Sequence, residues 1–160
     1  MSSAGTLRFL ILRDHRENRK KCTLTPLEGR EGFTFVRLGP EESFLLDSGL
    51  ILDVEGAPLR AEDRELVREV PIVVVDGSWA RAGKVLARLR MRSGALLERR
   101  SIPGIVTAYP RRSKLFQDPP AGLASIEAIY AASAILLEPR PDLLRDYHWA
   151  AEFLARNWGK

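Results

Sequence analysis

The chain is poor in the residues that build disulfides and metal sites. Its 160 residues include one cysteine, Cys22, and two histidines, His15 and His148. A single cysteine excludes an internal disulfide framework, and these three side chains are too few for a standard structural zinc site. We therefore expect neither a disulfide-stabilised fold nor a bound metal.

Long apolar runs are also missing. No segment approaches the roughly eighteen uninterrupted apolar residues of a membrane-spanning helix, and no small-residue cleavage site follows the short apolar run near the N-terminus. We therefore expect a cytoplasmic protein that makes no use of a membrane. With 45% hydrophobic residues, the chain fits one domain over residues 1–160 with a core of its own.

Acidic residues are scarce in the stretch 81–114. It holds ten lysines and arginines but only one acid, Glu98, so its net charge is +9, whereas the whole chain carries +4 and the remainder −5. Each basic side chain taken alone is compatible with ordinary solvation. As a set they favour an anionic partner, and nucleic acid is the obvious candidate.

Three basic clusters make up the expected RNA-binding surface. One is a stripe on a helix that lacks acids spaced for i,i+4 pairing, another is the polar loop at 14–21, and a third lies in the loop at 110–122. The residues assigned to RNA binding are Lys20, Lys21, Arg81, Lys84, Arg88, Arg111, Arg112 and Lys114.

Hydrophobic periodicity predicts an α/β fold with a mostly parallel sheet and helices on both faces. Apolar runs predict strands over residues 8–13, 32–38, 49–54, 73–75 and 105–109. Helical spacing predicts helices over residues 61–69, 78–92, 123–137 and 141–158, the third capped by Ser125 with Glu127 favourable in its first turn.

The most informative segment is the strand Val73-Val74-Val75 followed by Asp76, Gly77, Ser78 and Trp79. In parallel sheets, ligands bind beyond the carboxyl ends of the strands, where this segment would lie. Gly77 could serve only as a turn, Ser78 only as a helix cap and Trp79 only as a core anchor. Asp76 needs a partner or a function, because an unpaired buried carboxylate is costly.

Two motifs together resemble the DTW-domain family of RNA aminocarboxypropyltransferases. They are Asp-Gly-Ser-Trp at 76–79, in place of the eponymous Asp-Thr-Trp triplet, and Leu-Ala-Ser-Ile-Glu-Ala at 123–128. Tyr109 and the basic loop after it are similar to the tRNA-uridine branch of the family, although the cysteine-rich N-terminal segment of that branch is absent. The segments 14–23, 49–52 and 61–64 are more similar to the ribosomal small-subunit branch.

The resemblance implies a SPOUT-like fold with a C-terminal knot and S-adenosylmethionine as the donor substrate. It places Trp79 and Ala82 against the sulfonium methyl group, the backbone of Val75 near the ribose and Leu52 beside the adenine. The implied cofactor-binding residues are Thr23, Leu52, Val75, Ser78, Trp79, Ala82, Ile102, Ala108, Leu123 and Ser125.

The reaction implied is transfer of the 3-amino-3-carboxypropyl group to N3 of a uridine, with release of methylthioadenosine. Because a sulfonium is already a good leaving group, catalysis can depend mainly on positioning. N3 must lose its proton, and Asp76 is the one acid in the motif, so we expect it to orient the uracil or accept that proton.

Several alternatives follow from the same residues. The first expectation is a tRNA substrate, with small-subunit ribosomal RNA as the alternative. A SPOUT-class methyltransferase would use the same donor but release S-adenosylhomocysteine, and a non-catalytic RNA-binding protein would keep only the basic surface. A monomer is favoured, without a residue pattern that fixes the oligomeric state.

Overall fold

The computed structural model describes residues 6–16, 20, 22–40, 42–76, 79–110 and 122–159, and gives only the backbone at 79–82 and 93–95. Within these ranges the chain forms one five-stranded sheet in the order β2-β1-β4-β3-β5, and every pairing is parallel. The strands are β1 (Phe9–Asp14), β2 (Phe33–Leu38), β3 (Phe44–Pro58), β4 (Ile72–Asp76) and β5 (Leu89–Ser101). The predicted α/β class with a parallel sheet is confirmed.

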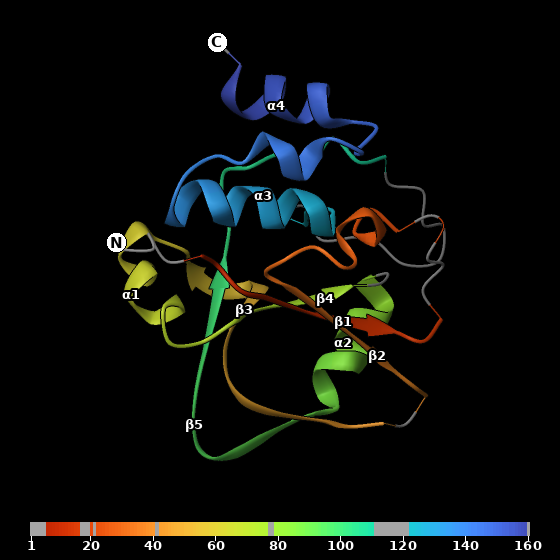
Figure 1. Cartoon of the computed structure of the whole chain (residues 1–160), viewed down its shortest axis with the longest axis vertical. Helices are drawn as coiled ribbons and strands as arrows, with labels where there is room; N and C mark the ends of the chain where they lie inside the picture. The colour runs from red at the N-terminus through yellow and green to blue at the C-terminus, as the bar shows by residue number, and fades with distance from the viewer. Residues whose placement is uncertain are drawn as a thin grey trace.

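Helices cover both faces of the sheet, as predicted (Figure 1). The helices are α1 (Arg64–Val67), α2 (Trp79–Ala87), α3 (Ser125–Leu136) and α4 (Ala150–Trp158), with 3-10 turns η1 (Thr25–Leu27), η2 (Ala61–Asp63) and η3 (Pro141–Leu144). No helix of the described ranges is long and apolar enough to span a membrane.

The period-two alternation of the central strands explains this layering. Ile11 of β1 and Val74 of β4 are buried in the larger core, which also contains the apolar face of α3. Their neighbours Leu12 and Val73 are buried in a second core together with Val85 of α2. Odd-numbered positions of β1 and even-numbered positions of β4 therefore face α3.

The prediction of a helix over 78–92 is wrong for the second half of that range. Helix α2 ends at Ala87, and β5 begins at Leu89 and continues to Ser101 beside a β3 that is much longer than the predicted 49–54. Arg92 lies on β5 and pairs with Asp47 of β3 at 2.7 Å, while Arg99 pairs with Asp53 at 2.6 Å. These partners are distant in sequence, so tertiary pairing overrides the local helical pattern.

Two further predictions at the C-terminal end are wrong. Residues 105–109 form no strand, because side chains take their backbone groups: Val106 N donates to Asn157 Oδ1 at 2.7 Å. The helix predicted over 141–158 is broken into η3 and α4 by a turn around Tyr147. The C-terminal knot implied by the family resemblance remains a prediction.

Candidate functional site

The candidate site lies where β1 and β4 end side by side. Arg13 of β1 is in register with Asp76 of β4, and both side chains are on the α3 face of the sheet. Both are charged and almost fully buried, with 3% and 4% exposure. Burial of two charges is tolerated when they pair and are hydrogen-bonded, which is the arrangement found here.

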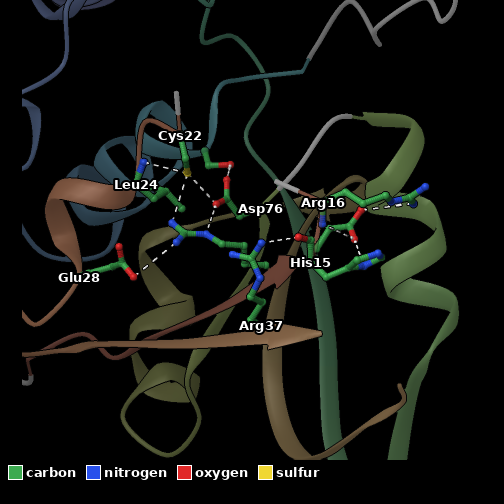
Figure 2. A network of polar contacts seen from close by, with 10 residues as sticks. His15, Arg16, Cys22, Leu24, Glu28, Arg37 and Asp76 are labelled. Carbon is green, nitrogen blue, oxygen red and sulfur yellow. Dashed lines mark hydrogen bonds and ion pairs between the residues drawn. The ribbon is translucent and has the colours of Figure 1, made fainter. Parts of the chain in front are cut away.

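Asp76 accepts three hydrogen bonds from three separate parts of the chain (Figure 2). Arg13 Nε donates to Oδ2 at 3.1 Å, and Cys22 Sγ donates to the same oxygen at 2.7 Å. Ser125 Oγ, in the first turn of α3, donates to Oδ1 at 3.3 Å. The strand end, the segment before η1 and the start of α3 therefore meet at one carboxylate.

Arg13 is the second hub of this network. Its Nη1 is 3.5 Å from Glu28 Oε1, its Nη2 donates to Cys22 Sγ at 3.4 Å, and its guanidinium lies 4.9 Å from the ring centroid of Phe35. Two carboxylates and an aromatic face thus balance one buried guanidinium.

Cys22 is a structural thiol rather than a reactive one. Burial, together with the negative charge of Asp76, raises the pKa of Cys22 to about 12. The sulfur therefore keeps its proton at neutral pH and donates it to Asp76, while it accepts from Leu24 N at 3.4 Å.

A second buried acid lies at the same sheet edge on the opposite face. Asp14, the last residue of β1, is fully buried, with its Oδ1 2.9 Å from His15 Nδ1. Arg16 reaches the same carboxylate through its backbone N at 3.3 Å and through Nη2 at 3.4 Å. Figure 2 shows this cluster beside the Asp76 network, and Arg37 donates there to the carbonyl oxygen of His15.

The roles of Arg13 and Asp14 and the bond from Cys22 were not predicted from the sequence. The available signal was an Arg-Asp pair that ends an otherwise apolar strand, since charged residues in such a run need partners. The partners themselves are 9 and 63 residues away along the chain, so no local pattern identifies them.

Four of the expected cofactor-binding residues gather at the α3 face. Ile102 and Ala108 are buried in the larger core, and Leu52 and Leu123 pack against it. Val75 lies on the other face, in the α2 core, which is compatible with the backbone role expected of it. Thr23 directly follows Cys22 and is half-buried. Ser78 lies outside the described residues, and Trp79 and Ala82, at the start of α2, are described by backbone alone.

Ser125 does not cap α3, contrary to prediction. The residue at the cap position is Ala124, and its backbone N donates instead to Glu127 Oε1 at 2.9 Å. Ser125 is the first helical residue, which leaves its hydroxyl directed to Asp76. The acidic side chain three residues into the helix replaces the expected serine cap.

Glu127 binds the segment around Thr107 and Ala108 to α3. Its Oε1 also accepts from Thr107 Oγ1 at 2.5 Å, and its Oε2 accepts from Ala108 N at 2.9 Å and from Tyr147 OH at 2.8 Å. Glu127 is fully buried, and burial with the charge of Glu127 raises the pKa of Tyr147, so the phenol remains a donor. These bonds fix the position of Ala108 relative to Ser125.

The expected RNA-binding residues lie in different environments. Lys84 and Lys20 are exposed, whereas Arg88 is half-buried and donates to the carbonyl oxygen of Gly39. Arg81 is described by backbone alone, and the other four predicted residues lie outside the described residues: Lys21, Arg111, Arg112 and Lys114. Acids from other segments neutralise part of the basic stretch, including Asp63 of η2, which pairs with Arg100 at 3.1 Å.

Metal ligands do not cluster in the described part of the chain. No group of three or more His, Cys, Asp or Glu side chains there is placed to hold an ion.

Comparison with known proteins assigns the family. Residues 50–159 match the family model described as Ribosome biogenesis protein, C-terminal. The chain belongs to this family. No curated protein matches the sequence.

The fold of this ribosome biogenesis family member is also similar to a solved structure. That structure is the SAM-dependent rRNA:acp-transferase Tsr3 from Vulcanisaeta distributa, with a TM-score of 0.70 and 26% sequence identity. The likeness covers 94% of this chain and 78% of that one.

Proposed function

We propose that the protein transfers the 3-amino-3-carboxypropyl group of S-adenosylmethionine to N3 of a uridine, or a modified uridine, in small-subunit ribosomal RNA. The observation that carries the proposal is the likeness to a SAM-dependent rRNA:acp-transferase over 94% of the chain. Membership of a ribosome biogenesis family favours ribosomal RNA over the tRNA substrate that was the first expectation. Residues 1–160 would act as one catalytic domain, in the ribosomal rather than the DTW-named branch of these transferases.

The residues at the α3 face suit a cationic nucleoside donor. Leu52, Ile102, Ala108 and Leu123 offer apolar surface for an adenosine, and they belong to the same face as the carboxylate of Asp76. The apolar wall would hold the adenosine, and Asp76, whose charge is balanced by Arg13, is left to contact the uracil. The donor supplies an activated carbon, so the protein needs no covalent nucleophile.

The remaining assigned residues complete the proposed donor site. Thr23 follows Cys22 of the network, Val75 presents its backbone between the two sheet faces, and Ser125 opens α3. Ser78, Trp79 and Ala82 would complete the wall at the start of α2, where Trp79 would enclose the methyl group that must not react. Such an enclosure would favour attack on the aminocarboxypropyl carbon over methyl transfer.

The RNA side of the proposal rests on charge. Uridine must leave its stack to expose N3, and basic side chains around the sheet edge would hold the flanking phosphates. Lys20 and Lys84 are exposed in the structure and suit this role. Arg88 contributes less freely, because its guanidinium is already bound to the Gly39 carbonyl.

A double-label experiment tests the proposal. The protein is incubated with S-adenosylmethionine carrying tritium in the methyl group and carbon-14 in the carboxyl group, with small-subunit ribosomal RNA or tRNA as acceptor. Carbon-14 in ribosomal RNA without tritium is the expected result. Tritium in RNA would support the rival methyltransferase. Carbon-14 in tRNA alone would support the tRNA substrate that was expected first. Absence of donor binding would support the non-catalytic RNA-binding protein.

A further inference from the structure

The two oxygens of Asp76 are not equivalent. Oδ2 accepts from Arg13 Nε at 3.1 Å and from Cys22 Sγ at 2.7 Å, so both of its lone-pair directions are occupied. Oδ1 accepts from Ser125 Oγ at 3.3 Å, a long contact for an O–H···O bond. Oδ1 therefore keeps the capacity to accept a further hydrogen bond.

The donors to Oδ2 are rigidly held, and this fixes the direction in which Oδ1 points. Arg13 is anchored by Glu28 and lies against Phe35, and Cys22 is fixed by Leu24 N and by Arg13 Nη2. A carboxylate with one oxygen fixed from two sides cannot rotate about its Cβ–Cγ bond without breaking both bonds. The second oxygen is therefore preorganised.

We propose that Arg13 and Cys22 are positioning residues that bind Oδ2 of Asp76 and so reserve Oδ1 for the N3–H group of the target uracil. This inference rests on the proposed function and adds that the two carboxylate oxygens of Asp76 have different roles. Arg13 and Cys22 act through Asp76, whereas Asp76 itself contacts the base.

The chemical step balances with Oδ1 as the proton acceptor. The N3 lone pair forms a bond to the aminocarboxypropyl carbon, and the bond from that carbon to sulfur breaks with its electron pair passing to sulfur. The N3 proton moves to Oδ1 and from there to water. The products are N3-substituted uridine and neutral methylthioadenosine, and no oxidant or metal is required.

The groups that face Asp76 come from three elements. They are Arg13 from β1, Cys22 from the segment before η1 and Ser125 from α3, with Glu28 reaching the far side of Arg13. Arg13 and Cys22 hold Oδ2 and do not contact the base. Removal of either donor should therefore slow the chemical step without weakening the binding of either substrate.

The test compares Cys22→Ala with Cys22→Ser under single-turnover conditions. Cys22→Ala removes one donor and should lower the transfer rate about tenfold, the equivalent of one net hydrogen bond. Cys22→Ser restores a donor and should recover the rate. The affinities for S-adenosylmethionine and for RNA should be unchanged in both variants.

Ile11→Val is the matched control. Ile11 is fully buried on β1, on the same face as Arg13 and two residues before it, and its truncation perturbs the core without removing a donor. It should lower the melting temperature and leave the transfer rate unchanged. A Cys22→Ala rate equal to that of Ile11→Val would overturn the inference.

Arg13→Lys decides the question if Cys22→Ala does not fold. Lysine keeps the charge but loses the Nε–H directed at Oδ2, so the rate should again fall. A wild-type rate in Arg13→Lys would refute the inference. If the wild-type protein itself transfers no aminocarboxypropyl group to any RNA, the proposed function fails, and that outcome is distinct from failure of the Oδ2 network.

Discussion

Replacement of Glu127 by glutamine should strongly destabilise the protein. Each carboxylate oxygen accepts two hydrogen bonds, Oε1 from Thr107 Oγ1 and Ala124 N, and Oε2 from Ala108 N and Tyr147 OH. The glutamine amide has one oxygen, and its NH₂ group would face a backbone N–H that then lacks an acceptor and a hydroxyl that can no longer donate there. Both charge-assisted hydrogen bonds on that side are lost. Hydrogen bonds to a charged group contribute about 1.5–3 kcal/mol each, so the loss of two costs about 3–6 kcal/mol.

A loss of this size is measurable by thermal and urea unfolding. In a domain of this length each kcal/mol corresponds to about 2–4 °C, which predicts a melting temperature lower by roughly 6–24 °C. Tyr147→Phe removes one of the four bonds and should cost about half as much. Glu152→Gln, an exposed carboxylate paired with Arg156, is the control and should change stability by less than about 1 kcal/mol. A Glu127→Gln melting temperature within about 2 °C of the wild type would show that the charged carboxylate is not needed to hold its four donors.

Three further predictions concern the site and its charges. Asp76→Asn should reduce transfer about 100-fold or more while S-adenosylmethionine affinity, measured by calorimetry, stays close to wild type; unchanged turnover would remove Asp76 from the mechanism. The folded protein keeps the Cys22 proton to about pH 12, whereas the unfolded thiol loses it near pH 9. The free energy of unfolding should therefore fall as the pH rises through this window, by up to about 1.4 kcal/mol per pH unit. Urea titrations of Cys22→Ser should show a shallower fall. Lys84→Ala should weaken RNA binding and reduce its salt slope by about one, whereas Arg92→Ala, whose guanidinium pairs with Asp47, should change the slope less in filter-binding assays.

The need of Asp76 for partners was predictable from the sequence because local rules apply there. An acid that follows three valines at the end of a parallel strand must be buried, and a buried carboxylate needs partners. The structure supplies them: Asp76 is 4% exposed and has three donors. The positions of the central strands and of α3 were predictable because the apolar periodicity of these segments is strong.

The errors arose where distant side chains replace local backbone preferences. The β5 strand contains Leu89, Arg90 and Met91, which continue the helical pattern of α2 in sequence but pair with β3 in space. Residues around Val106 have strand-like composition, yet their hydrogen bonds go to Asn157 and Glu127. These partners are 51 and 19 residues away, beyond the reach of any local pattern.

The basic stretch shows the same limitation for charge. Its net charge of +9 is a property of the sequence, but Asp47, Asp53 and Asp63 from other segments neutralise arginines on β5. Charge counted along the chain therefore overestimates the electrostatic attraction that RNA meets at this surface.

The by-product of the reaction distinguishes aminocarboxypropyl transfer from methyl transfer. The protein, S-adenosylmethionine and a small-subunit ribosomal RNA transcript are incubated together, and the nucleoside released is identified by liquid chromatography and mass spectrometry. We expect methylthioadenosine in an amount equal to the aminocarboxypropyl groups gained by the RNA, and loss of both in Asp76→Asn. Release of S-adenosylhomocysteine, with methyl groups gained by the RNA instead, would contradict the proposed aminocarboxypropyl transfer.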